Sequence, residues 1–370
     1  MKTVLLIFGT RPEAIKMAPV IKELEKHPDS FKTNICITAQ HREMLDQVLR
    51  FFSITPDYDL NLMQPEQSLF DITTDGLKGL RGVFDDCRPD IVCVQGDTTT
   101  AFIGSLAAFY KNVKIAHIEA GLRSGDKHSP YPEEINRILV GHLADYHFAP
   151  TEKATRNLLR EGINQNVHTV GNTVVDALFL GQSIIKRQGD DVYRNFFSFL
   201  DVSNKIILVT GHRRESFGKP FQDICHAIRE IATLYPDVQV VYPVHRNPNV
   251  HNPVTAILKG INNIYLIEPI DYPHLIWLLN KSFLVLTDSG GIQEEAPSLG
   301  KPLLVMREVT ERTEGIVAGT AKLVGTDQQK IIREFSILVT DKAAYKKMSQ
   351  SHNPYGDGKS ASRIVDILKE

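Results

Sequence analysis

The sequence predicts an α/β fold with two doubly wound, Rossmann-like parallel-sheet domains that face a cleft. Short apolar runs alternate with helix-length segments along the chain, and runs of this kind form strands buried on both faces. Polar and glycine-rich segments directly follow several runs, as they do at the carboxyl ends of parallel strands. The 370 residues are enough for two such domains, each with its own core.

The first domain is predicted over residues 1–170. Its strands are expected at the apolar runs 4–8, 34–38, 91–95, 114–118, 146–149 and 167–170. The loop from Gly9 leads into a helix with Pro12 near its start, which is a favoured position for proline. Residues 52–68 lack periodicity and are expected to form an irregular excursion. The alternation of strands and helices indicates right-handed crossovers within one parallel sheet.

The second domain is predicted over residues 171–359, because a new series of strands and helices begins after residues 171–173. Its strands are expected at 206–210, 238–243, 264–267, 283–286 and 303–305. A final helix, about residues 360–370, has no strand of its own. We expect it to pack back on the first domain.

A glycine-rich loop separates the strand at 283–286 from the next helix, which is expected over residues 292–299. Ser289 is a candidate helix N-cap, and Gly290 and Gly291 allow close backbone approach by a ligand. Such a loop is either an ordinary strand–helix turn or an anion site. Glu295, one helical turn further, would repel a phosphate that it touched but could accept bonds from two ribose hydroxyls. Together these residues indicate a nucleoside diphosphate.

Charged residues also follow other predicted strands. Asp97 and Glu119 each follow a strand directly, and Glu133 opens a helix. Each could simply cap a helix. If the fold gathers them in one cleft, their charges would raise one another's pKa and allow proton transfer near neutral pH.

Cationic and imidazole groups follow strands as well. Arg11 and Lys16 lie after the first strand, His212 follows the strand at 206–210, and Arg312 follows the strand at 303–305. A solvated surface role is the alternative for such charges. Acids and bases gathered together would suit a phosphorylated substrate whose neutral part faces the carboxylates.

The composition narrows the class of protein. A formal net charge of −2 offers no basic stripe for nucleic acid and no polybasic membrane patch. Four cysteines without CxxC spacing predict buried thiols in a reducing cytosol, and no ligand cluster predicts a metal. No apolar stretch approaches the length of a membrane span.

Eight segments, in order along most of the chain, resemble the non-hydrolysing UDP-N-acetylglucosamine 2-epimerases. They are GTRPEAIKMAPV, QGDTTTA, EAGLR, PEEINR, TGHRRES, YPVHRNP, TDSGGIQEEAPSLGKP and TERTEG. The resemblance implies the glycosyltransferase-B architecture and a homodimer. It also implies reversible conversion of UDP-N-acetylglucosamine to UDP-N-acetylmannosamine, which supplies surface polysaccharide synthesis.

The resemblance further implies a mechanism without cofactor or metal, in which anti elimination of UDP gives 2-acetamidoglucal and UDP then adds back. It assigns proton transfer to Asp97, Glu119 and Glu133, and stabilisation of the leaving phosphate to His212. It assigns substrate binding to a larger set: Arg11, Lys16, Ile270, Leu275, Ser289, Gly290, Gly291, Glu295 and Arg312.

Some members of that family bind a second UDP-N-acetylglucosamine as an activator. Gln40, His41 and Gln47 match that allosteric site. Glu66 stands where those members carry a basic residue, and a carboxylate there would oppose a diphosphate. We therefore expect weak or absent activation by the substrate.

Three other functions stay open at this point. A hydrolysing epimerase would release UDP and free N-acetylmannosamine, which NMR of the products would detect. A glycosyltransferase of the same architecture would not exchange the C2 proton with deuterium. A nucleotide-sugar sensor would show no turnover.

Overall fold

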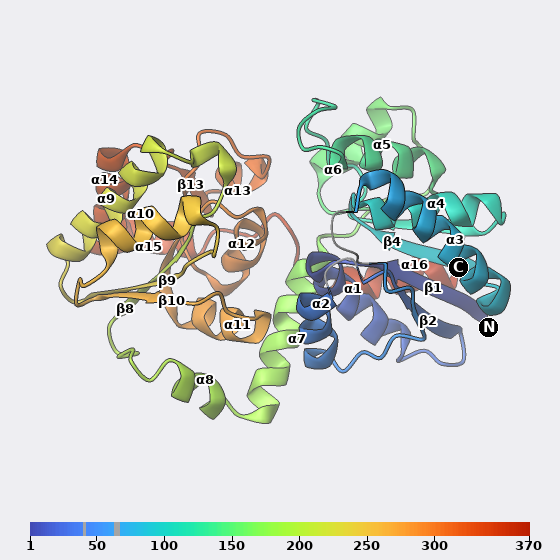
Figure 1. The fold of residues 1–370 in the computed structure, drawn as a ribbon, viewed down its shortest axis with the longest axis horizontal. Helices are drawn as coiled ribbons and strands as arrows, with labels where there is room; N and C mark the ends of the chain where they lie inside the picture. The colour runs from blue at the N-terminus through green and yellow to red at the C-terminus, as the bar shows by residue number, and fades with distance from the viewer. Residues whose placement is uncertain (40–41, 63–66) are drawn as a thin grey trace. The chain divides into compact units, whose positions relative to one another are not determined.

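The computed structural model describes residues 1–39, 42–62 and 67–370, and it divides into two compact units. Unit 1 comprises Met1–Leu180 and Tyr355–Glu370, and unit 2 comprises Gly181–Pro354. The chain therefore leaves unit 1 after Leu180 and returns to it at Tyr355. Each unit is built around one parallel sheet (Figure 1), so the predicted two-domain α/β fold is confirmed.

Within the described residues, the sheet of unit 1 has seven parallel strands in the order β3-β2-β1-β4-β5-β6-β7. Their bounds are β1 Lys2–Phe8, β2 Phe31–Ile37, β3 Tyr58–Asp59, β4 Ile91–Gln95, β5 Lys114–Ile118, β6 Tyr146–Ala149 and β7 Val167–Thr169. The order reverses between β1 and β4, which makes the sheet doubly wound. The short strand β3 lies inside the segment expected to be irregular.

The helices of unit 1 form two groups by their contacts. One group contains α1, α2 and α16, and the other contains α3, α4 and α5. The helices with all their residues in unit 1 are α1 Arg11–Leu24, α2 Arg42–Phe51, α3 Leu69–Cys87, α4 Thr99–Tyr110, α5 Glu133–Leu143, α6 Glu152–Arg160 and α16 Ser360–Lys369. Helix α7, Thr173–Gln188, begins in unit 1 and ends in unit 2. The C-terminal helix α16 contacts α1 within unit 1, where its apolar side chains are buried.

Unit 2 repeats the doubly wound plan with the strand order β10-β9-β8-β11-β12-β13. Its strands are β8 Lys205–Thr210, β9 Val238–Pro243, β10 Ile264–Ile267, β11 Ser282–Thr287, β12 Leu303–Val305 and β13 Ala321–Leu323. Its helices are α8 Asp191–Phe196, α9 Lys219–Leu234, α10 Pro248–Leu258, α11 Tyr272–Lys281, α12 Gly290–Glu295, α13 Thr313–Ala318, α14 Gln328–Thr340 and α15 Lys342–Ser349, with 3-10 turns at η1 Arg214–Ser216 and η2 Ala296–Leu299. Strand β13 is a further strand that the apolar pattern did not indicate.

Burial explains why these segments form strands. All five residues of β4 are buried, as are five of the seven residues of β1, so neither strand shows polar alternation. In unit 2, apolar side chains of α9, α10 and α14 pack with those of the strands in one core. Gly9 is required after β1, because a Cβ there would lie 1.9 Å from Thr38 Oγ1 and 2.7 Å from Thr100 Oγ1.

Candidate functional site

Several candidate residues follow the carboxyl ends of the strands that flank the point of reversal in each sheet, where doubly wound folds bind ligands. In unit 1, the buried Glu13 links the two loops at this point. Its carboxylate accepts hydrogen bonds from Gly9 N at 3.0 Å and Thr10 N at 2.8 Å, and from Thr98 Oγ1 at 2.6 Å. Burial raises the pKa of Glu13. The loops after β1 and β4 are thereby fixed to one another.

Glu119 lies directly after β5 and is 8% exposed. Its carboxylate pairs with Lys16 of α1, accepts a hydrogen bond from Gln95 Nε2, and lies 3.3 Å from the donor Asn172 Nδ2. Its φ of 67° is in the left-handed region, which is uncommon for a residue with a long side chain. Strain of this kind persists where the surroundings fix the residue, and it is frequent at functional sites.

Asp97 lies in the loop after β4 and is held by α5. Its carboxylate pairs with Arg137, and its carbonyl oxygen accepts a hydrogen bond from Asn136 Nδ2 at 3.0 Å. Burial raises the pKa of Asp97; the Arg137 charge opposes this change, and the Glu119 charge adds to it. The negative charge of Glu119 therefore acts on the carboxylate of Asp97.

Glu133 is the first residue of α5 and is half-buried. It lies four residues before Arg137, on the same face of the helix, so it shares the face that contacts Asp97. The adjacent Glu134 is buried and structural. Its carboxylate accepts hydrogen bonds from Ser124 N and Gly125 N, both at 3.0 Å, and pairs with Arg137.

Three residues of unit 1 with a direct role at these carboxylates were not predicted from the sequence. Gln95 and Asn172 donate to Glu119, and Arg137 pairs with Asp97. Gln95 is the last residue of a buried strand, so its polar side chain was an available signal. Of the predicted cations in unit 1, Lys16 contacts Glu119. Arg11 is the first residue of α1.

In unit 2, the corresponding point of reversal lies between β8 and β11. His212 follows β8, and Asp288 follows β11. Asp288 Oδ2 accepts hydrogen bonds from His212 N at 2.6 Å and Arg213 N at 2.8 Å. Partial burial lowers the pKa of His212, and the negative charge of Asp288 opposes this change. Asp288 therefore joins the two loops, as Glu13 does in unit 1.

The helix after β11 begins earlier than expected and is shorter. Helix α12 begins at Gly290, where we expected residue 292, and the chain tightens into η2 after Glu295. Ser289 occupies the N-cap position, but its side chain makes no capping hydrogen bond. Gly290 has an ordinary negative φ, and its lack of a side chain serves close packing, because a Cβ would lie 3.3 Å from the Arg312 guanidinium carbon.

Glu295 is 5% exposed, and its Oε1 accepts a hydrogen bond from Tyr272 OH at 2.7 Å. Tyr272 is the first residue of α11, so this bond brings Glu295 toward the segment that contains Ile270 and Leu275, both of them half-buried. Arg312 pairs instead with neighbouring acids. Its Nε lies 3.0 Å from Glu294 Oε1, and its Nη1 lies 2.7 Å from Glu311 Oε2.

The residues assigned to a second ligand site are only partly described. Gln40, His41 and Glu66 lie outside the described residues, so the second ligand site stays a prediction. Gln47 is an exposed residue of α2.

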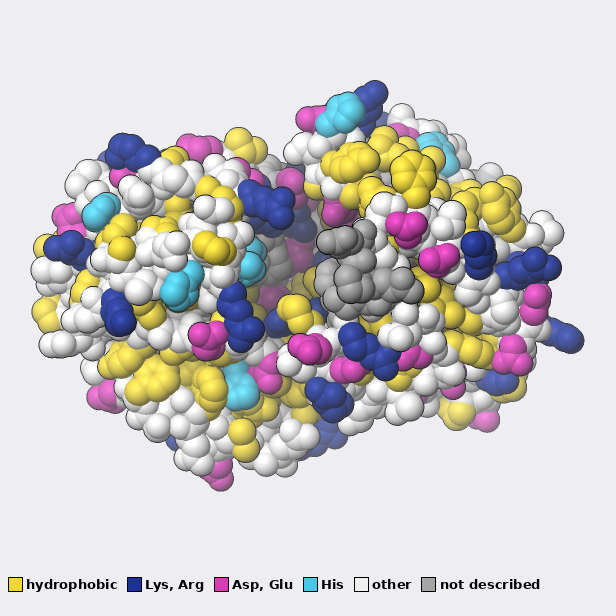
Figure 2. Space-filling view, viewed as in Figure 1, with side chains coloured by type: hydrophobic (Ala, Val, Ile, Leu, Met, Phe, Trp, Pro, Cys, Tyr) yellow, Lys and Arg dark blue, Asp and Glu magenta, His cyan; other side chains and the backbone are white. Residues whose placement is uncertain are grey.

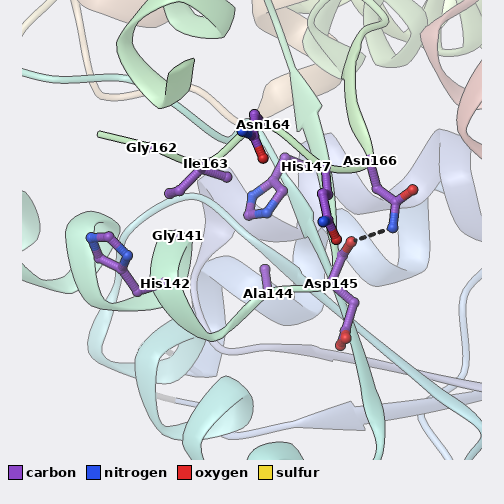
Figure 3. Close-up of a pocket in the computed structure, with 10 residues that line it drawn as sticks. Gly141, His142, Ala144, Asp145, His147, Gly162, Ile163, Asn164 and Asn166 are labelled. Carbon is purple, nitrogen blue, oxygen red and sulfur yellow. Dashed lines mark hydrogen bonds between the residues drawn. The ribbon is translucent and has the colours of Figure 1, made fainter. Parts of the chain in front are cut away.

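A polar pocket of about 390 Å³ in unit 1 is separate from all of these residues. It is lined by residues 141–147, apart from 143 and 146, and by residues 162–166 (Figure 3), all of which lie before or at the beginning of strands β6 and β7. Asn166 Nδ2 donates to Asp145 O across it at 3.0 Å. The pocket thus opens at the amino ends of strands, and the candidate residues follow the carboxyl ends.

One face of the molecule has mixed charge. On the face seen in Figure 2, Lys and Arg side chains are interspersed with Asp and Glu and do not form one basic stripe. Among the helices of the described ranges, none combines the length and apolar character needed to span a bilayer.

Comparisons with known proteins agree over nearly the whole chain. A family profile described as UDP-N-acetylglucosamine 2-epimerase matches residues 22–369. The UDP-N-acetylglucosamine 2-epimerase of Escherichia coli (strain K12) is 55% identical over 371 residues, which cover 99% of this chain and 98% of that protein. The crystal structure of UDP-GlcNAc 2-epimerase from Neisseria meningitidis bound to UDP-GlcNAc matches with a TM-score of 0.92 and 50% identity, and the match covers 99% of each chain.

A more distant structure shows the fold alone. Sucrose-phosphate synthase from Thermosynechococcus elongatus is 12% identical and matches with a TM-score of 0.65 over 100% of this chain and 98% of that chain. The architecture is thus of the glycosyltransferase-B kind that the family resemblance implied. From the profile match and the 55% identity over its full length, this chain belongs to the UDP-N-acetylglucosamine 2-epimerase family.

Proposed function

We propose that this protein interconverts UDP-N-acetylglucosamine and UDP-N-acetylmannosamine by inverting the configuration at C2 of the sugar. Family membership supports the substrate and the reaction, and the Neisseria relative at 50% identity was crystallised with UDP-GlcNAc. The observation that carries the mechanism is the coupled pair of carboxylates in unit 1. Asp97 and Glu119 follow adjacent strands, and each is paired with a cation.

The proposed reaction is an elimination followed by re-addition. A carboxylate removes the C2 proton, the C–H electron pair forms a C1=C2 double bond, and the C1–O pair leaves with UDP. In the second step, a diphosphate oxygen of UDP attacks C1, and an acid protonates C2 from the opposite face. Two proton-transfer groups are needed. We assign these transfers to Asp97, Glu119 and Glu133.

The raised pKa of Asp97 supports a role for this residue in proton transfer. A carboxyl group whose pKa lies closer to neutrality transfers protons more readily in both directions at physiological pH. Glu119 pairs with Lys16, so a cation lies beside this carboxylate as well.

We assign the nucleotide to unit 2. First-turn N–H groups of a helix lack intrahelical partners and attract anions, which suits the loop at Ser289, Gly290 and Gly291 to the diphosphate. Glu295 would accept bonds from the ribose hydroxyls. His212 would stabilise the charge that develops on the departing diphosphate.

The same proposal extends to the cellular role. We propose that the protein acts as a cytoplasmic homodimer and supplies UDP-N-acetylmannosamine to surface polysaccharide synthesis. Analytical ultracentrifugation tests the dimer, because a monomer at micromolar concentration would contradict it.

The decisive experiment is incubation of UDP-N-acetylglucosamine with the protein in D2O, followed by NMR. The expected result is both epimers of the nucleotide sugar with deuterium at C2. Unlabelled C2 would contradict epimerisation through proton removal. Accumulation of UDP and free N-acetylmannosamine would identify the hydrolysing reaction instead.

Three substitutions test the assignment of the acids. Asp97→Asn, Glu119→Gln and Glu133→Gln are each expected to lower kcat by roughly 10²–10⁴-fold, as for loss of an acid–base group. Glu152→Gln is the matched control, because Glu152 is an exposed acid that also begins a helix after a strand of unit 1. Near-normal turnover in any one of the three would remove that residue from the mechanism.

A further inference from the structure

Asp288 is a buried carboxylate whose two oxygens have different surroundings. It is 2% exposed, and its Oδ2 accepts the two backbone hydrogen bonds from His212 and Arg213. Its Oδ1 has no hydrogen-bond partner among the described residues, and it lies 3.5 Å from His212 Nδ1. A buried oxygen left without a donor costs free energy. An N–H on Nδ1 of His212 would supply that donor.

A second imidazole lies against the first. The rings of His212 and His245 are stacked, with centroids 5.5 Å apart and an angle of 12° between planes. His245 Nδ1 accepts a hydrogen bond from Asn247 N at 3.1 Å, so its ring proton is on Nε2. Protonation of His245 at Nδ1 would break that bond. Two charged rings at this separation would also repel one another.

We propose that Asp288 is a positioning residue that makes His212, and not the stacked His245, the ring that gains a proton when a nucleoside diphosphate binds to unit 2. One observation favours protonation of His212, and another disfavours protonation of His245. His212 has an anionic acceptor beside Nδ1, whereas Nδ1 of His245 is already an acceptor. Both rings follow strands of one sheet, at the edge where doubly wound folds bind ligands.

The charged groups around His212 explain why a ligand is needed. The His212 side chain is 43% exposed, and the part of its ring that is shielded from water lowers its pKa; Asp288 raises the pKa, and Arg213 and His245 lower it further. These opposing contributions favour the neutral ring in the free protein at neutral pH. A diphosphate bound beside the ring would add negative charge and shift the balance toward the cation. This inference rests on the proposed function only in taking UDP as the diphosphate.

For the reaction, the consequence is that His212 is cationic when UDP departs from C1. A cation with an N–H directed at the diphosphate stabilises the charge that grows on the leaving group. The negative charge of Asp288 keeps that proton on the ring. The hydrogen bonds that Asp288 accepts from His212 N and Arg213 N fix the position of the loop that carries the ring. Asp288 thus acts through His212 and does not need to touch the substrate.

The test is an NMR titration of the full-length protein labelled with ¹³C in its histidine rings. His212→Gln and His245→Gln assign the two signals. UDP at saturation is expected to raise the pKa of His212 by about one unit or more and to change that of His245 much less. Asp288→Asn, which keeps an oxygen acceptor for the loop, is expected to lower the pKa of His212 by about one unit or more, with and without UDP.

A matched control is Asp327→Asn. Asp327 caps α14 through one hydrogen bond from Lys330 N at 2.7 Å, so its replacement removes the same charge from unit 2 and should leave both rings unchanged. A second readout is calorimetry of UDP binding in buffers with different ionisation enthalpies. Proton uptake at pH 7.5 is expected with the wild-type protein and should fall in Asp288→Asn.

Two results would overturn the proposal: His212 titrating identically in Asp288→Asn and wild type, or His245 being the ring that gains the proton. If Asp288→Asn does not fold, absence of proton uptake on UDP binding by the wild-type protein overturns it equally. If the wild-type protein does not bind UDP, the nucleotide assignment fails. The titration of His212 in the free Asp288→Asn protein then still decides the role of Asp288.

Discussion

Asp176 provides a quantitative test of how burial acts on this fold. It lies in α7, is 6% exposed, and accepts a hydrogen bond at its Oδ1 from Ala361 N at 2.8 Å, in the first turn of α16. A helix N-terminus favours a negative charge. Burial nevertheless has the larger effect and raises the pKa of Asp176 to about 6. The charged form is therefore destabilised in the folded chain.

The direction and magnitude of the effect of Asp176 on stability follow from the linkage between proton binding and folding. Between its usual value of 3.8 and about 6, the folded protein binds the proton and the unfolded protein does not, so stability falls as pH rises through this window. At 1.36 kcal/mol per pKa unit, the difference corresponds to about 3 kcal/mol. Asp176→Asn keeps an oxygen acceptor for Ala361 N and removes the charge. It should stabilise unit 1 at pH 8 by up to about 3 kcal/mol and have little effect near pH 4.

Hydrogen exchange measured by mass spectrometry is the suitable assay. The one tryptophan of the chain, Trp277, lies in unit 2, so its fluorescence would not report on Asp176. Peptides covering residues 170–180 and 355–370 should exchange up to about 100-fold more slowly in Asp176→Asn than in wild type at pH 8. The two proteins should converge as the pH falls below 5.

A control of opposite sign is Asp71→Asn. The pKa of the exposed Asp71 is lowered by its hydrogen bonds with Ser68 in the capping box of α3, so this substitution should reduce the protection of α3 at neutral pH. If Asp176→Asn lowered protection of α16 at pH 8, the charge would be stabilising. The helix N-terminus would then outweigh burial in its effect on the charged form of Asp176.

Three further predictions concern the candidate site. Arg137→Ala removes the cation paired with Asp97, so the acidic limb of the pH profile of kcat/KM should move upward by about one unit or more; an unchanged limb would separate that limb from Asp97. Glu295→Ala should weaken UDP binding by about 1–3 kcal/mol in calorimetry, and equal affinity would reject the ribose contact. Asn172→Ala removes a donor to Glu119 and should lower kcat about tenfold with KM nearly constant; a change in KM alone would indicate a binding role.

Much of the fold followed from local patterns. Apolar runs predicted the strands that are buried on both faces, because such strands need no polar alternation. The short strands β3 and β13 were missed, since two or three residues carry too little pattern to distinguish a strand from a loop. The start of α12 at Gly290 was also missed, because helix ends depend on capping contacts that a sequence only suggests.

The candidate residues also divide into those that local sequence indicated and those that it did not. Position after a strand identified Asp97, Glu119 and His212, because the carboxyl ends of parallel strands meet at one edge whatever their order. Their partners were not identified. Arg137 is 40 residues from Asp97 in sequence, and Asp288 is 76 residues from His212. Partners this distant are set by which strands are neighbours.

The sequence by itself determined that this chain forms two parallel sheets with acids and imidazoles after their strands, and that it resembles one epimerase family. Periodicity and motif are local properties, so a linear chain displays them fully. The tertiary structure alone decided that β1 lies beside β4 and β8 beside β11. That order brings Lys16 to Glu119 and Asp288 to His212, and it thereby sets which charges lie beside each group. Electrostatic interactions act through space over a few ångströms, and folding, not sequence separation, fixes those distances.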